Sequence, residues 1–191
     1  VETKPVREPN INIEFVDQIK STFPDDRYSF TDEDRLIHSH GQTTSEEVYK
    51  ILYSEIDSNV DMVFYIETEE EAVALISLAQ EHDVCLVPFG GGTSVSSALK
   101  IPASETRMVV AIDTRRMDQI EWINDEDRRV CVQAGIIGSR LEELLGEKGY
   151  TVGHEPDSIE LSTLGGWIAT NASGMKKNRY GNIEDIVENV S

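Results

Sequence analysis

Residues 84–95 read Val-Cys-Leu-Val-Pro-Phe-Gly-Gly-Gly-Thr-Ser-Val, so a short apolar run leads directly into three consecutive glycines. The run 84–87 is too brief for a helix and predicts a buried strand. Glycines carry no side chains, which lets backbone N–H groups converge on an anion such as a pyrophosphate. Thr93 and Ser94 add hydroxyl donors. The stretch therefore predicts a strand followed by an anion-binding loop.

This glycine loop differs from the two commonest phosphate-binding loops. It lacks the Gly-Lys-Ser/Thr ending of a Walker A loop and the spaced Gly-x-Gly-x-x-Gly pattern of a Rossmann turn. A flexible glycine linker is the plain alternative. Three glycines between an apolar strand and a pair of hydroxyls are unusual for a linker, so we favour anion binding.

Two further apolar runs, 62–66 and 108–112, predict buried strands on either side of this stretch. Between the first of them and 84–87, Thr68 and Glu71 form a capping-box pattern, which predicts a helix that ends near His82. Strand, helix and strand in this order are typical of a parallel βαβ unit. The unbroken apolar character of 108–112 places that strand inside a covered sheet.

The first 58 residues predict a helical extension. Apolar residues recur at helical spacing over 15–23, where Pro24 ends the pattern, and again over 45–56. The second helix carries an apolar face made of Val48, Ile51, Leu52 and Ile56. Residues 25–42, which separate the two helices, are charged and are expected to be irregular.

After Asp113 the pattern changes from continuous to alternating hydrophobicity, which predicts a hairpin over 120–134 with a charged turn at 124–127. A helix over 139–148 follows, and Gly149 stands where a left-handed C-cap is needed. We place a change of subdomain near residues 114–118.

Composition excludes several classes of partner and site. The 17 Lys plus Arg residues against 36 Asp plus Glu give a net charge of −19, which makes nucleic acid and anionic membrane poor electrostatic partners. Cys85 and Cys131 each lie in an apolar run and predict buried thiols rather than a disulfide framework. No cluster with metal-ligand spacing is present, so we expect no metal site.

Three segments near the C-terminal end of the sequence, 153–158, 161–167 and 170–174, are rich in small residues and hydroxyls. Backbone of this kind can lie against a flat ligand, and hydroxyls and amides can satisfy ring nitrogens and ribose oxygens. A tightly packed helix start at Gly165 and Gly166 is the structural alternative. The two interpretations are compatible.

These strings resemble the alkyldihydroxyacetonephosphate synthase family, above all Gly-His-Glu-Pro-Asp-Ser at 153–158 and Ala-Ser-Gly-Met-Lys-Lys-Asn at 172–178. The glycine loop alone is shared with the wider vanillyl-alcohol-oxidase type of FAD-binding domain. The resemblance runs from about Phe15 to the end and is strongest over 84–187. The family pattern is broken at 96–99, where Ser-Ser-Ala-Leu replaces the usual Ser-Tyr-Gly-Leu.

The resemblance implies an α/β (α+β) fold of two FAD-binding subdomains, the first with a small parallel sheet and the second mixed. It assigns residues 1–58 to the extension, 59–115 to the first subdomain and 116–191 to an incomplete second subdomain. The substrate cap of the family is expected to be absent from these residues, so this portion alone is expected to be inactive.

The resemblance also implies which residues bind FAD. The expected contacts in the first subdomain are Pro88, Phe89, Gly90, Gly91, Gly92, Thr93 and Ser94. Those in the second subdomain are Asp157, Ser158, Ile159, Glu160, Leu161, Ser162, Thr163, Thr170, Asn171, Ala172 and Ser173.

The implied reaction exchanges the acyl chain of acyl-dihydroxyacetone phosphate for a long-chain fatty alcohol through a flavin N5 adduct, with no net redox change. The resemblance further implies a homodimer, a peroxisome or a related organelle such as a glycosome, and peripheral membrane contact through parts outside this chain. An FAD-dependent 2-hydroxy-acid dehydrogenase or oxidase of the same fold is the alternative. A cofactor-free interaction module is a third class.

For several single residues the sequence allows either a functional or a structural role. His154 is a catalytic candidate, since a histidine near neutrality can steer a proton or bind a phosphate, or it is a structural residue that fixes its loop. Lys176, Lys177 and Arg179 are the densest basic cluster, and we favour a phosphate-neutralising role over a solvated loop. His38 and His40 are expected on a surface loop.

Overall fold

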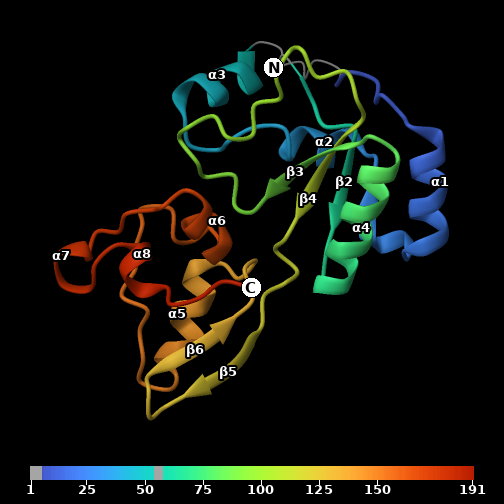
Figure 1. Cartoon of the computed structure of the whole chain (residues 1–191). Coiled ribbons are helices and arrows are strands. Elements are labelled where there is room, and N and C mark those ends of the chain that lie inside the picture. Colours follow the sequence, from blue (N-terminus) through green and yellow to red (C-terminus); the bar gives the residue numbers. More distant parts are fainter. Residues whose placement is uncertain (1–5, 54–57) are drawn as a thin grey trace. The chain divides into compact units, whose positions relative to one another are not determined.

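The structure is a computed structural model that describes residues 6–53 and 58–191. The chain divides into two compact units, one ending at Thr114 and the other beginning at Arg115 (Figure 1). Among the described residues, no helix combines the length and the apolar character needed to cross a bilayer.

The first unit is built on a four-stranded sheet of β1 (Tyr28–Ser29), β2 (Met62–Tyr65), β3 (Cys85–Phe89) and β4 (Val109–Asp113). The strand order is β1-β2-β4-β3, with β2 and β3 parallel to β4 and β1 antiparallel to β2. The predicted parallel βαβ arrangement is confirmed. However, β4 lies between the two strands that the crossover helix joins, a pairing that local sequence does not encode.

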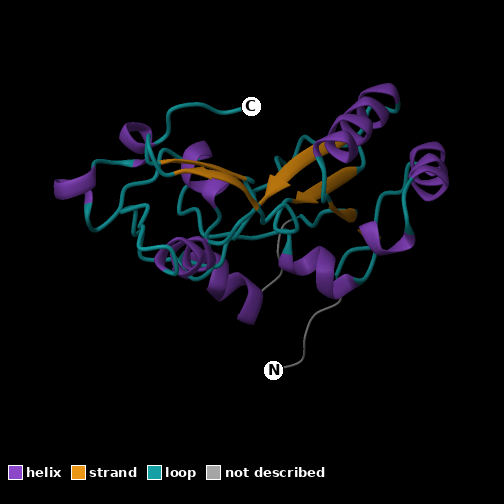
Figure 2. Ribbon diagram, turned by 90° about the horizontal axis from the view of Figure 1, so that it is seen from below, coloured by secondary structure: helices purple, strands orange, loops and turns teal. Residues whose placement is uncertain are grey.

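Five helical elements accompany this sheet: α1 (Ile13–Thr22), the 3-10 turn η1 (Asp25–Arg27), α2 (Asp32–Ile37), α3 (Ser45–Tyr53) and α4 (Glu69–Glu81). Helices lie on both sides of the strands (Figure 2), and all five residues of β4 are buried. Thr68 caps α4 by accepting a hydrogen bond from the N–H of Glu71, as predicted.

The prediction of an irregular segment over 25–42 is wrong. Thr31 caps α2 by accepting a hydrogen bond from the N–H of Asp34, and β1 pairs with β2. A helix of six residues is too short to show a clear period, and a two-residue strand exists only through its tertiary pairing. The expected apolar face of α3 is not buried among the described residues, and Ile56 lies outside them.

A buried carboxylate ties the chain before α1 to the sheet. The side chain of Asp61, fully inaccessible, accepts hydrogen bonds from the N–H of Asn10 at 2.7 Å and the N–H of Val109 at 2.8 Å. The guanidinium of Arg7 also pairs with this carboxylate, with 2.9 Å between Nη2 of Arg7 and Oδ1 of Asp61. The start of β4 is thereby fixed to a segment about 100 residues earlier in the chain.

The second unit begins with an antiparallel hairpin of β5 (Ile120–Asn124) and β6 (Arg129–Val132), as predicted. Four helices follow: α5 (Gly138–Gly146), α6 (Leu164–Ala169), α7 (Lys177–Tyr180) and α8 (Ile183–Ile186). The left-handed conformation expected at Gly149 is confirmed by its φ of 79°. Trp167 is buried in this unit, whereas Trp122 on the hairpin is 52% exposed and so does not serve as a core residue.

We predict that Asp61→Ala destabilises the first unit by about 2–4 kcal/mol, because it leaves two backbone N–H groups without their partner. The measurement is urea unfolding followed by circular dichroism, together with hydrogen exchange at the Val109 amide, which should become faster. Asp17→Ala, at an exposed position on α1, is the matched control and should change neither. Unchanged exchange at Val109 would contradict this account of the Asp61 network.

Candidate functional site

The glycine loop leaves the sheet at the carboxyl end of β3, the edge where open parallel sheets bind ligands. Strand β3 continues to Phe89, so Pro88 and Phe89 lie in the strand and the loop itself begins at Gly90. The carbonyl of Phe89 accepts a hydrogen bond from the N–H of Thr114 at 3.1 Å, just beyond the end of β4. The loop thus starts from a fixed point of the sheet.

Gly92 is the residue in the loop for which glycine is required. Its φ of 65° lies in the left-handed region that L side chains rarely adopt. A Cβ added there would also lie 3.1 Å from Cζ of Phe89. Both the backbone conformation and the close approach of the aromatic ring therefore disfavour a side chain at this position.

The loop uses its carbonyl groups and its N–H groups differently. The carbonyls of Gly91, Gly92 and Thr93 accept hydrogen bonds from residues 42 and 43. In contrast, no hydrogen bond between the residues that the structure describes has an N–H of residues 90–94 as its donor. A row of uncommitted N–H groups fits an anion such as a pyrophosphate.

A contact between two buried polar side chains supports the strand that leads into the loop. His38 Nε2 lies 2.9 Å from Asp113 Oδ2, and both side chains are 2% exposed. Nδ1 of His38 lies 2.7 Å from the carbonyl oxygen of Asp34. A carbonyl can only accept, so Nδ1 is the donor of this hydrogen bond. The His38 ring also contacts Phe89, with 4.4 Å between centroids.

The prediction that His38 lies on a surface loop is therefore wrong. His38 follows α2, and its partner Asp113 ends β4, 75 residues later in the chain. Local sequence contains no signal for a pairing across this distance. Gln42 and Thr43, which contact the glycine loop, were missed for the same reason.

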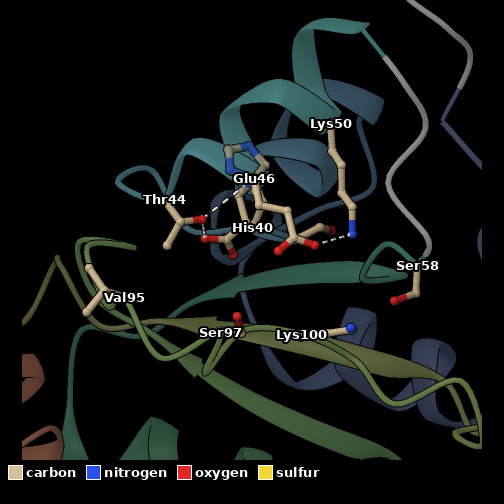
Figure 3. A pocket seen from close by; sticks show the side chains of 10 residues that line it. His40, Thr44, Glu46, Lys50, Ser58, Val95, Ser97 and Lys100 are labelled. Carbon is tan, nitrogen blue, oxygen red and sulfur yellow. Dashed lines mark hydrogen bonds and ion pairs between the residues drawn. The ribbon is translucent and has the colours of Figure 1, made fainter.

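A cavity of about 240 Å³ lies between α3 and the segment that follows the glycine loop (Figure 3). His40, Thr44 and Lys50 line it from the helical side, and Val95, Ser97 and Lys100 line it from the other side. Lys50 pairs with Glu46 at 3.0 Å. Over residues 6–53 and 58–191 no cluster of three or more His, Cys, Asp or Glu side chains could hold a metal ion.

In the second unit, the predicted contacts 157–163 form a compact turn that leads into α6. The hydroxyl of Ser162 donates to the carbonyl of Ser158 at 2.8 Å and accepts from the indole N–H of Trp167 at 2.7 Å. Thr163 caps α6 by accepting from the N–H of Gly166 at 3.2 Å. The side chains of Ser162 and Thr163 are buried and engaged within the unit, so their contacts to a ligand would involve the backbone.

His154 is the most unusual side chain of this unit. It is 1% exposed, yet neither ring nitrogen has a hydrogen-bond partner in the structure. Its ring packs against Trp167, with 4.8 Å between centroids. Burial lowers the pKa of His154, partly offset by the charge of Glu184, so the ring is neutral at pH 7. A buried histidine without partners fits a site that a bound molecule completes.

The remaining predicted contacts, Thr170 to Ser173, follow α6 on the surface of the same unit. The N–H of Ala172 donates to the carbonyl of Trp167 at 2.9 Å, and the Ser173 hydroxyl donates to Asn182 at 2.9 Å. Asn171 adopts a left-handed φ of 51°. In the basic cluster nearby, Lys176 pairs with Glu155, and the Arg179 guanidinium lies 5.1 Å from the centre of the Tyr180 ring.

Comparison with known proteins defines the family. The family described as "FAD binding domain" matches residues 60–191. The chain belongs to this family of FAD-binding domains. FAD is accordingly its cofactor, and the expected two-subdomain α/β fold is confirmed.

Individual relatives show which members of the family the chain is similar to. The chain is 44% identical over 183 residues to alkyldihydroxyacetonephosphate synthase of Caenorhabditis elegans, a match that covers 96% of this chain and 30% of the relative. A solved structure of alkyldihydroxyacetonephosphate synthase superposes with a TM-score of 0.91 at 35% identity, covering 96% of this chain and 34% of that one. The mitochondrial D-lactate dehydrogenase of Arabidopsis thaliana is more distant, at 29% identity over 174 residues, 91% of this chain and 28% of the relative. The FAD-binding chain thus spans about 30% of the length of the synthase.

We predict that Gly92→Ala weakens FAD binding about 5- to 30-fold, since the loop of the variant relaxes when free and must regain the left-handed conformation, at a cost of about 1–2 kcal/mol, in order to bind. The measurement is FAD titration of the full-length protein by flavin fluorescence. Gly146→Ala is the matched control, because a Cβ there meets nothing within 4 Å, and it should bind FAD as the wild type does. Equal FAD affinity of Gly92→Ala and wild type would contradict the required loop conformation.

We predict that His154 makes the second unit less stable as pH falls. Its folded-state pKa lies below the unfolded value of about 6.5, so the unfolded chain binds the proton more readily. Stability is therefore full above that pH and is lost, by up to about 1.4 kcal/mol per pH unit, as pH falls towards the folded-state pKa. The measurement is urea unfolding at pH 7.5 and 5.5 by tryptophan fluorescence.

His154→Phe keeps a ring beside Trp167 but cannot titrate, so it should lose less stability over this interval than the wild type. Comparing the two proteins cancels the contribution of the carboxylates. An identical pH dependence in both would show that His154 is not the group responsible.

Proposed function

We propose that this chain is the FAD-binding part of an ether-lipid synthase, which exchanges the acyl chain of acyl-dihydroxyacetone phosphate for a long-chain fatty alcohol. The observation that carries the proposal is the buried, unpartnered His154 within its Gly-His-Glu-Pro-Asp-Ser string, in a chain 44% identical to an alkyldihydroxyacetonephosphate synthase. The glycine loop is common to many FAD-binding domains and would not by itself distinguish this reaction.

In this proposal the loop from Gly90 to Ser94 holds the FAD pyrophosphate through its N–H groups, after a strand that ends in Pro88 and Phe89. Residues 157–163 and 170–173 of the second unit supply further contacts, largely through the backbone. The available groups suit the cofactor, because the loop offers N–H donors without partners between described residues. Gly92 has no side chain, which lets the loop backbone pack closely against the Phe89 ring. Uncommitted donors favour the negatively charged pyrophosphate over a neutral ligand.

The proposed reaction conserves electrons. The bond between carbon 1 of dihydroxyacetone phosphate and the fatty-acid oxygen breaks, and a bond from the same carbon to the alcohol oxygen forms. The products are a fatty acid and an alkyl ether, and the proton of the alcohol passes to the medium. FAD, when bound, supplies a nucleophilic ring nitrogen to this exchange.

His154 is the residue of this chain that we assign to proton handling. Because its pKa is lowered by burial, the ring is neutral and one of its nitrogens can accept a proton at pH 7. Trp167 and the adjacent Gly174 fix the ring in place, since a Cβ at Gly174 would lie 3.2 Å from Nδ1. The ring is thus held in one orientation with its nitrogens uncommitted.

The proposal extends to the whole protein. We propose a homodimer that acts in a peroxisome or a peroxisome-like organelle such as a glycosome, with peripheral membrane contact through residues outside this chain. The long alkyl and acyl chains of the substrates motivate the membrane contact, because such molecules partition into bilayers.

An FAD-dependent 2-hydroxy-acid dehydrogenase of the same fold is the second candidate, supported by the more distant similarity to D-lactate dehydrogenase. The two candidates differ in electron flow. A dehydrogenase reduces its flavin with each hydroxy acid, whereas the synthase leaves the flavin with the electrons it had.

We predict that the full-length protein, supplied with palmitoyl-dihydroxyacetone phosphate and hexadecanol, releases palmitate and forms the hexadecyl ether in equal amounts. Mass spectrometry of the lipid products measures both. D-lactate and D-2-hydroxyglutarate should leave the flavin absorbance unchanged under anaerobic conditions. Bleaching by either hydroxy acid without ether formation would instead establish the dehydrogenase. A purified full-length protein without FAD would contradict both enzymes and favour an interaction module.

A further inference from the structure

Gln42 and Thr43, which lie between α2 and α3, form hydrogen bonds with the glycine loop. The backbone N–H of Gln42 donates to the carbonyl of Gly92 at 2.7 Å, and its side-chain amide donates to the carbonyl of Gly91 at 3.3 Å. The hydroxyl of Thr43 donates to the carbonyl of Thr93 at 3.0 Å. Three successive carbonyls of the loop are therefore bound by two adjacent residues.

The segment that contains Gln42 and Thr43 is itself anchored to α3. Glu47 accepts a hydrogen bond from the N–H of Gly41 at 2.9 Å, and its own N–H donates to the Thr44 hydroxyl at 3.2 Å. The Thr44 hydroxyl thereby caps the start of α3, and it also contacts the Glu47 carboxylate. A Cβ at Gly41 would lie 2.7 Å from a Glu47 carboxylate oxygen, so glycine allows this approach.

These bonds determine where the loop's N–H groups point. In a trans peptide the C=O of one residue and the N–H of the next share a plane and point in opposite directions. Fixing the carbonyls of Gly91, Gly92 and Thr93 consequently fixes the N–H groups of Gly92, Thr93 and Ser94. Those N–H groups are among the ones without a partner between described residues.

We infer that Gln42 and Thr43 are positioning residues for the FAD pyrophosphate. They contact the loop on its carbonyl side and orient its N–H groups towards the anion. The inference rests on the proposed placement of the pyrophosphate at the loop.

Thr43→Val in the full-length protein tests the inference, because valine keeps the shape of threonine and removes the hydroxyl donor. We expect a roughly three- to tenfold weaker FAD affinity, the effect of one hydrogen bond. We also expect the ³¹P resonances of the bound pyrophosphate to shift, a change that a loss of general stability would not produce. Thr43→Ser, which retains the hydroxyl, should restore both properties.

Thr106→Val is the matched control, since Thr106 is exposed in the same unit and its hydroxyl makes no hydrogen bond between described residues. It should bind FAD as the wild type does. If Thr43→Val lowers the unfolding midpoint, Gln42→Met replaces it, because that variant removes only the side-chain amide that donates to Gly91.

Two failures are distinguishable. If the wild type binds FAD and Thr43→Val matches it in affinity and in ³¹P resonances, the inference is wrong and the proposed function stands. If the wild type binds no FAD at all, the proposed function is wrong and the inference falls with it.

Discussion

The rest of the site depends on one constraint: a peptide N–H can bind an anion only if its peptide plane is fixed in advance. The glycine loop lacks the side chains that would fix it, so the order must come from outside. Residues 42 and 43 supply it through three bonds to the loop carbonyls. The His38–Asp113 pair supports Phe89, from which the loop departs. In our proposal, glycine leaves the loop accessible to the cofactor, and residues 42 and 43 orient its peptide planes.

Much of the fold follows from local sequence. The strands around β2, β3 and β4 each coincide with an apolar run, and the hairpin coincides with alternation around a polar turn. These elements are predictable because the pattern of buried and exposed positions in each segment can be recognised from that segment alone. The position of β4 between β2 and β3 is not predictable in this way, because it depends on pairing across the chain. The short elements α2 and β1 were not predicted, because six and two residues are too few to show a hydrophobic period.

The candidate site likewise contains residues that local sequence predicts and residues that only the structure reveals. The sequence predicts Gly90 to Ser94 as a binding loop from their composition, and His154 as a candidate from its motif. The residues that orient them did not stand out, because Gln42, Thr43 and His38 belong to a polar segment with no distinctive pattern. His154 carries the chemistry that we assign to this chain, and its burial without a partner is visible only in three dimensions. The structure thus adds supporting residues to a site whose central residues are predictions from sequence.

The most direct test of the central claim is the amide spectrum of the loop glycines in full-length protein labelled with ¹⁵N-glycine, recorded before and after FAD is added. The account predicts that the amide resonance of Gly92 moves downfield on binding, as an N–H group that donates to an anion does. The amide of Gly146, in α5, should not move. FAD binding that left the Gly92 resonance in place would contradict the claim that this loop holds the pyrophosphate.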